Sequence, residues 1–126
     1  MVHVTVPLTR FDTGPKAWLK TLVKKMLLGK KWNLEHANVS RNRLNDLIRN
    51  IYQGRDPVFD LAAIESVALT GETAKFSYGG QLYPSLYSGY TSDGGHLSET
   101  GKRIVAERLL VLLAKIVDKS KSPKIL

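Results

Sequence analysis

Apolar residues along this chain follow two kinds of spacing, one typical of strands and one typical of helices. In residues 2–6, valine alternates with polar residues, which predicts a strand that Pro7 then ends. Residues 58–64 form a short, nearly continuous apolar run, which favours a strand buried on both faces, as in a parallel sheet. An internal start at Met1 would explain why the first strand begins at the second residue.

Three further segments have the helical spacing, in which apolar residues return every three or four positions. The first runs over residues 15–28, with proline in its first turn and Gly29 as the expected end. The second covers residues 36–52. The third covers residues 98–117, where Ser98 is the expected N-cap.

The order of these elements indicates the fold class. Residues 66–95 separate the second strand from the last helix; they are rich in glycine and tyrosine and predict a long irregular segment, of the kind that is functional or poorly ordered. Strands alternating with helices favour an α/β layer fold with a parallel sheet. Two strands are too few for a self-sufficient parallel sheet, so the pattern is typical of part of a larger one.

Composition narrows the class of protein. The chain has 126 residues, 43% hydrophobic and 24% charged, which suits one globular domain and excludes a disordered or fibrous protein. No apolar run approaches the roughly 18 residues of a membrane-spanning helix. The first residues lack the pattern of a signal peptide, so a cytoplasmic location is the default expectation. The absence of cysteine excludes a disulfide scaffold, a thiolate zinc site and a cysteine nucleophile.

The net charge is +8, with +5 of it in residues 1–35, and residues 119–126 add a basic tail. This balance permits binding to nucleic acid or anionic lipid without requiring either. Residues 16–31 are cationic and amphipathic and could lie on an anionic membrane surface. We favour the simpler interpretation, a helix that packs on the sheet and solvates its lysines, and we do not favour nucleic acid as a partner.

The sequence contains no motif that is typical of a metal or cofactor site. The three histidines, His3, His36 and His96, lack the spacing of metal ligands. No glycine loop has the spacing of a phosphate-binding motif. We therefore expect neither a metal nor a cofactor.

One short segment carries candidate chemistry. Asp93 and His96 lie three residues apart in a glycine-rich turn just before the last helix. A carboxylate that accepts a hydrogen bond from one ring nitrogen fixes the tautomer of the imidazole and leaves the other nitrogen free as a general base. The alternative is an aspartate that caps the turn beside a surface histidine, because a lone pair at this spacing is a weak signal.

The residues around this pair resemble a known family. The run Asp93-Gly94-Gly95-His96-Leu97-Ser98, followed by Gly101 and an apolar helix, looks like the last conserved block of the SGNH (GDSL-type) hydrolases. Residues 56–65 resemble the family's final strand, and residues 2–9 resemble the strand before it. The resemblance implies the C-terminal portion of a flavodoxin-like, three-layer α/β/α fold with parallel strands. Residues 1–118 would form this partial domain and residues 119–126 a tail.

In that family the block supplies the Asp and His of a Ser-His-Asp triad, which implies catalytic roles for Asp93 and His96 in hydrolysing an ester of a lipid or an acetylated sugar. The family's Gly-Asp-Ser nucleophile motif is absent, and Asn45-Asp46 lacks the glycine of its oxyanion-hole motif. The local serines do not lie in a nucleophile elbow; they are Ser85, Ser88, Ser92 and Ser98.

Two interpretations of function therefore stay open. In the first, the chain is the part of an ester hydrolase that holds the base and its orienting carboxylate, and is inactive without the missing half. In the second, it is a truncated product or a small basic interaction domain in which the pair is a relic. Apolar surface left exposed by a missing half could cause self-association.

Overall fold

The computed structural model describes residues 1–11, 15–28 and 34–122. In chain order, the elements are β1 (His3–Val4), α1 (Pro15–Leu28), α2 (Leu34–Tyr52), β2 (Val58–Phe59), α3 (Leu61–Ser66), β3 (Lys75–Tyr78), β4 (Gln81–Pro84), the short 3₁₀ helix η2 (Ser88–Tyr90) and α4 (Glu99–Lys121). The chain is a mixed α/β protein with one small parallel sheet and one antiparallel pair.

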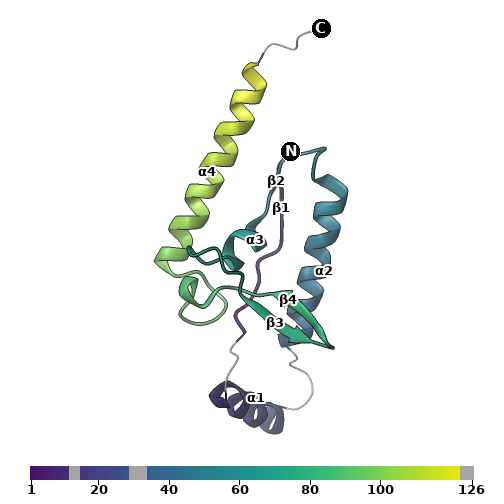
Figure 1. Cartoon of the computed structure of the whole chain (residues 1–126), viewed down its shortest axis with the longest axis vertical. Helices are drawn as coiled ribbons and strands as arrows, with labels where there is room; N and C mark the ends of the chain where they lie inside the picture. The colour runs from purple at the N-terminus through teal and green to yellow at the C-terminus, as the bar shows by residue number, and fades with distance from the viewer. Residues whose placement is uncertain (12–14, 29–33, 123–126) are drawn as a thin grey trace.

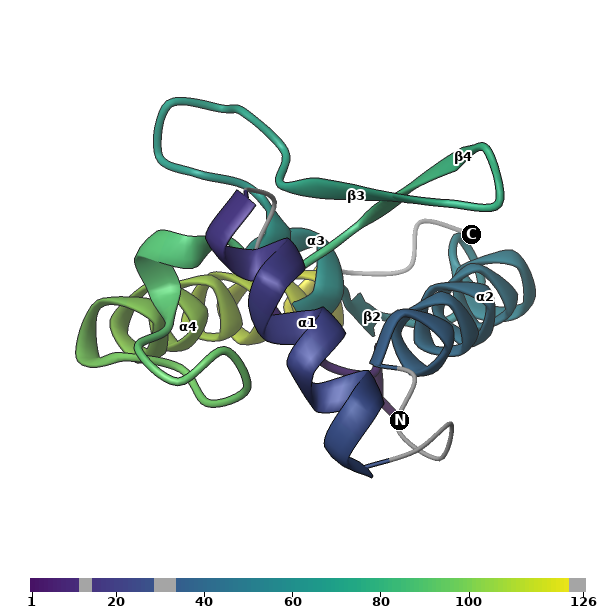
Figure 2. The same ribbon diagram turned by 90° about the horizontal axis from the view of Figure 1, so that it is seen from below.

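The predicted parallel pairing is confirmed. β1 pairs with β2 in parallel, with His3 opposite Val58 and Val4 opposite Phe59. The backbone amide of Thr5 adds a hydrogen bond of 3.2 Å to the carbonyl of Phe59. The pair lies between α2 and α4 in both views of the molecule (Figures 1 and 2). Both strands run toward the end of the molecule where α1 lies (Figure 1).

Beyond β1, side chains of α2 take the place of a neighbouring strand. The amide of Asn45 accepts from the backbone N–H of Val6 at 2.6 Å and donates to its carbonyl at 2.9 Å. Asn38 does the same for Thr9, at 3.1 and 3.3 Å. Because the two asparagines lie seven residues apart, two helical turns, they face the same side of α2. They hold the chain after β1 against the helix.

The predicted strand over residues 58–64 is wrong beyond Phe59. There Asp60 is the N-cap of α3, and its carboxylate accepts from the backbone N–H of Ala63 at 3.2 Å. The same carboxylate binds the guanidinium of Arg49 on α2 at 2.7 and 2.8 Å. An N-cap with an ion pair starts a helix where the apolar run alone favoured a strand.

The segment expected to be irregular contains a hairpin. β3 and β4 pair antiparallel, with Phe76 opposite Tyr83, and turn at Gly79 and Gly80. Both glycines have positive φ, +59° and +77°, which a two-residue hairpin turn of this kind requires. Phe76 and Tyr83 then pack with Val39 of α2 in one of two apolar clusters.

The second cluster lies beneath the candidate site. Leu8, Ala62, Leu86 and Tyr90 are buried together, with Leu97 and Ile104 packed against them. This cluster joins the segment after β1, α3, the segment from β4 to η2 and the start of α4, so the turn before α4 packs on the core.

The helix predictions are confirmed in their main features. α1 begins at Pro15, and Ser98 caps α4, accepting from the backbone N–H of Gly101 at 3.3 Å. α4 continues to Lys121. The expected helix end at Gly29 and residues 123–126 of the basic tail lie outside the described residues. Over the ranges that are described, no helix combines the length and the hydropathy needed to cross a membrane.

Candidate active site

The turn that holds Asp93 and His96 is closed at its base by backbone contacts. Thr91 and Leu97 form an isolated antiparallel bridge, and the backbone N–H of Ser98 donates to the carbonyl of Tyr90 at 2.7 Å. Gly101 lies under this closure, where a Cβ would be 2.7 Å from the carbonyl oxygen of Tyr90. Only glycine leaves room for the turn to approach α4 this closely.

Asp93 and His96 are brought together as the sequence predicts. Asp93 Oδ2 lies 2.6 Å from His96 Nδ1. Asp93 Oδ1 accepts from the backbone N–H groups of Gly95 and His96, at 2.9 and 2.8 Å. One carboxylate oxygen therefore shapes the turn, while the other orients the imidazole.

The turn is tied to its surroundings through Thr91 and Arg10. The buried hydroxyl of Thr91 accepts from the backbone N–H of Gly94 at 2.9 Å and lies 3.4 Å from Asp93 Oδ1. On its other side, the carbonyl of Gly94 accepts from the backbone N–H of Arg10 at 2.8 Å. The segment after β1 and the turn before α4 are thus joined directly at the site.

The hydrogen bonds to Asp93 keep its carboxyl ionised. The backbone N–H groups of His96 and Gly95, together with the imidazole, hold the pKa of the Asp93 carboxyl well below its ordinary value. An ionised carboxylate only accepts hydrogen bonds, so Nδ1 of His96 carries the hydrogen, and in the neutral imidazole Nε2 is then the nitrogen with the lone pair. This is the tautomer that a general base needs.

The free edge of the imidazole faces solvent. The side chain of His96 is 92% exposed, and among the described residues Asp93 is its one hydrogen-bond partner. None of the serines considered as nucleophiles has a hydrogen bond to the His96 ring in the described residues: Ser85 is buried, Ser88 and Ser92 are exposed, and Ser98 caps α4. Asn45 is engaged with Val6 and offers no oxyanion hole. The described residues thus place the Asp93 carboxylate against an exposed imidazole.

Other titratable groups lie apart from this pair. His3 stacks on Tyr52 with ring centroids 3.6 Å apart, and its Nε2 is 3.4 Å from Asp56 Oδ2. His36 lies edge-on to Tyr78. Over the part of the chain that the structure describes, no group of three His, Asp or Glu side chains could hold a metal ion.

Sequence reasoning missed Glu65, which is buried in α3. Its side chain accepts from the backbone N–H of Leu8, and its carbonyl accepts from that of Tyr87 at 2.9 Å. Burial raises the pKa of this carboxyl to about 7, while the hydrogen bond from Leu8 and the charge of Arg41 oppose the rise. Its position in a run interpreted as a strand gave no sign of this role.

Thr91 and Arg10 were also missed. A threonine hydroxyl that accepts from a backbone N–H a few residues further on is a common turn contact, whereas the contact of Arg10 with Gly94 joins positions far apart in the chain and leaves no local signal.

Comparisons with family models, with curated proteins and with solved structures found no match to this chain.

Proposed function

We propose that this chain supplies the base and the orienting carboxylate of an ester hydrolase of the SGNH type. The observation that carries the proposal is the 2.6 Å contact of Asp93 Oδ2 with His96 Nδ1, with the rest of the imidazole open to solvent. The parallel pair between α2 and α4 supports the same proposal, because it suits the last strands of a flavodoxin-like three-layer sheet.

In this mechanism His96 Nε2 takes the proton of a serine hydroxyl as the serine oxygen attacks the ester carbonyl carbon. Asp93 stabilises the imidazolium that forms. As the tetrahedral intermediate collapses, the bond to the alcohol oxygen breaks and His96 returns the proton to it. Water then attacks the acyl-serine by the same sequence of proton transfers and releases the acid.

The serine and the oxyanion donors come from a segment outside this chain. On this account the isolated chain holds no activated serine. A fluorophosphonate probe, which phosphonylates activated serines, is therefore expected to leave the purified chain unlabelled. Labelling of any serine here, checked by mass spectrometry, would contradict the assignment of the nucleophile to another segment.

The role of His96 is tested separately with an activated ester. We expect purified chain to hydrolyse p-nitrophenyl acetate slowly, since an oriented imidazole with a free Nε2 is itself a catalyst for such esters. His96→Ala is expected to lose most of this rate. The matched control is His36→Ala, which removes another exposed imidazole and is expected to keep it. Equal rates in the two variants would overturn the role proposed for His96.

A second candidate, a basic interaction helix, rests on the surface of α1. Met26 and Leu27 are 80% and 78% exposed, and Lys16 and Lys20 are exposed on the same helix. Exposed apolar side chains beside lysines suit an anionic lipid surface. If this candidate is correct, the chain binds anionic vesicles, and Met26→Glu with Leu27→Glu abolishes that binding. Equal binding to neutral vesicles would count against it.

A further inference from the structure

Glu65 of α3 joins the two chain segments that support the turn of the candidate site. Its side chain accepts a hydrogen bond from the backbone N–H of Leu8, in the segment after β1. Its carbonyl accepts from the backbone N–H of Tyr87, in the segment after β4, at 2.9 Å. The two segments also bond to each other, because the N–H of Leu86 donates to the carbonyl of Thr9 at 3.1 Å. One buried residue thus holds both segments against α3.

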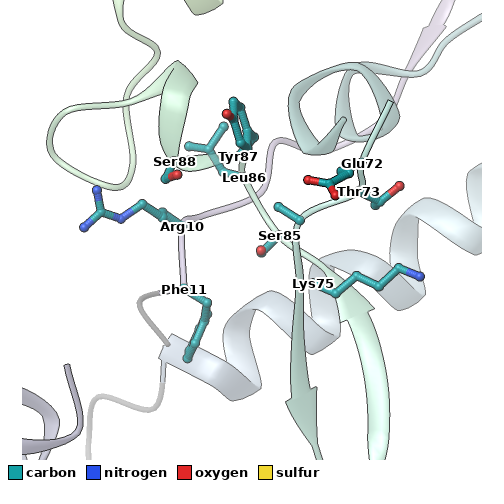
Figure 3. Close-up of a pocket in the computed structure, with 10 residues that line it drawn as sticks. Arg10, Phe11, Glu72, Thr73, Lys75, Ser85, Leu86, Tyr87 and Ser88 are labelled. Atoms are coloured by element: carbon teal, nitrogen blue, oxygen red, sulfur yellow. The ribbon is translucent and has the colours of Figure 1, made fainter. Parts of the chain in front are cut away.

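Both segments also bond to the turn itself. From the segment after β1, the backbone N–H of Arg10 donates to the carbonyl of Gly94 at 2.8 Å. From the segment after β4, the carbonyl of Tyr90 accepts from the N–H of Ser98 at 2.7 Å. Figure 3 shows Arg10 and Tyr87 among the walls of one pocket, which has a volume of about 250 Å³. A movement of either segment therefore displaces the turn and reshapes this pocket.

The carboxyl of Glu65 is an ionisable group that is buried without an ion-pair partner. Glu65 is 2% exposed, and no ion pair links it to another described residue. Burial, opposed by the hydrogen bond from Leu8 and by the charge of Arg41 on α2, raises the pKa of this carboxyl to about 7. The adjoining segments and α4 bring further charged or titratable side chains, which are Arg10, Tyr87, Tyr90 and, acting on Tyr90, Arg108. The carboxyl therefore changes its charge near neutral pH.

Ionisation changes what this buried side chain requires of its surroundings. A buried carboxylate without an ion-pair partner is unfavourable, and contact with water relieves the cost. The side chain lies against the segment after β1, where it binds Leu8. Separation of this segment from α3 therefore exposes the carboxylate to water. The neutral carboxyl gains much less from such an opening, so it favours the closed arrangement.

We propose that Glu65 is a positioning residue that makes the local stability of the Asp93–His96 turn depend on pH. With its carboxyl neutral, Glu65 keeps the segment after β1 against α3, and the turn is held in place. With the carboxyl ionised, the segment separates from α3 more often, and the contact of Arg10 with Gly94 is lost with it. The regulation of hydrolysis that follows rests on the proposed function, whereas the coupling of Glu65 to the turn does not.

The test is hydrogen exchange of backbone amides in the purified chain, followed by proton–nitrogen NMR and corrected for the intrinsic effect of pH on exchange. Between about pH 5 and about pH 7, we expect the protection of the Leu8 and Arg10 amides to fall by up to about 40-fold, because opening releases the proton that the buried carboxyl holds. Glu65→Gln keeps an acceptor for Leu8 and cannot ionise, so its protection should not change with pH. Arg41→Gln removes a charge that favours the ionised form, so the fall should extend to higher pH.

The matched control is Glu72→Gln, the same change at an exposed carboxyl, and it should keep the pH dependence of the parent. Amides in the middle of α2, residues 44–48, report unfolding of the whole chain and should be better protected than Leu8 and Arg10. The proposal is overturned if protection at Leu8 and Arg10 does not change with pH, if Glu65→Gln retains the change, or if the α2 amides are no better protected. Because the experiment uses no ester, this result is independent of the hydrolysis test of His96. Either proposal can fail while the other stands.

Discussion

At Asp93, the two carboxylate oxygens have separate partners, and this division explains why an aspartate occupies the position. Oδ1 accepts from backbone amides of the turn, and Oδ2 accepts from His96 Nδ1. An asparagine could still offer its oxygen to the turn. Its NH₂ group, however, would face Nδ1 as a donor and would force the imidazole hydrogen to Nε2. The shape of the turn and the chemistry of the base can therefore be separated by one substitution.

Asp93→Asn is therefore expected to keep the fold and to reduce hydrolysis of p-nitrophenyl acetate to the rate of His96→Ala. In a complete triad, the corresponding change of tautomer costs roughly 10⁴-fold in kcat. Circular dichroism would verify the fold in parallel. Full activity in Asp93→Asn would show that the carboxylate does not set the tautomer.

Glu65 makes the stability of the chain depend on pH. Its pKa is raised from 4.5 to about 7, so the folded state keeps a proton that the unfolded state has lost. The contribution of Glu65 to stability is therefore largest below pH 4.5, falls as the pH rises to about 7 and is constant above it, with a total loss of up to about 3 kcal/mol. Asp93 acts in the opposite sense but at lower pH, because its pKa is depressed.

Glu65→Gln keeps an acceptor for the N–H of Leu8 and removes the ionisation. Urea unfolding of both proteins at about pH 5 and about pH 8 measures the effect. We expect the variant to gain stability relative to the parent at the higher pH. All other titratable groups are the same in both proteins, so their contributions cancel in the comparison. A constant difference between the two proteins across this range would contradict the burial of an ionisable carboxyl here.

At the scale of elements, the asparagines of α2 make the hydrogen bonds that a neighbouring strand would otherwise make to the segment after β1. The segment after β1 has its backbone groups bonded on one side by Asn38 and Asn45 and on the other by Glu65 and Leu86. This segment ends at Arg10, which contacts the Asp93–His96 turn. The position of the site thus depends on a helix that contributes no residue to it.

Asn45→Ala is expected to lower the free energy of unfolding by about 2–3 kcal/mol, because both the N–H and the carbonyl of Val6 lose their partner. Asn50→Ala, at an exposed position of the same helix, is the matched control and should change stability by less than about 0.5 kcal/mol. Urea unfolding gives both values. Similar losses in the two variants would mean that Asn45 does not support the segment.

The elements also show what sequence patterns can and cannot predict. Helical spacing located α1, α2 and α4 well, and the spacing of Asp93 and His96 predicted their contact. The apolar run from Val58 predicted a strand that was too long, because periodicity does not distinguish a buried strand from a short helix. The N-cap of that helix at Asp60 was overlooked. The pair Gly79-Gly80 between segments rich in aromatic residues was a hairpin signal that could have been recognised. The asparagine contacts of α2 join distant segments and could not be predicted from spacing.

At the scale of the whole molecule, apolar surface is left open on several elements. Val4 of β1, Leu47 of α2 and Leu110 of α4 are 51%, 53% and 66% exposed. Where such side chains gather into a patch, the patch is typical of an interaction face. It agrees with a domain whose sheet is continued by another segment, as the proposed function requires.

We expect the isolated chain to self-associate through this surface, in a concentration-dependent manner that analytical ultracentrifugation measures. Replacing Leu110 and Leu113 of α4 by lysine should shift the distribution toward monomer. Leu69→Lys, at a leucine that is 82% exposed in the loop after α3, should not. A chain that stays monomeric at high concentration would contradict the interpretation of α4 as an interaction face.

The central claim is that Asp93 holds His96 as a base with its Nε2 lone pair free. Proton–nitrogen NMR of the histidine rings, at a pH where the imidazoles are neutral, tests this directly, with His36 as the internal comparison. The account predicts that His96 carries its hydrogen on Nδ1 and that Asp93→Asn moves it to Nε2. A hydrogen on Nε2 of His96 in the unmodified chain, or the same spectrum in Asp93→Asn, would contradict it.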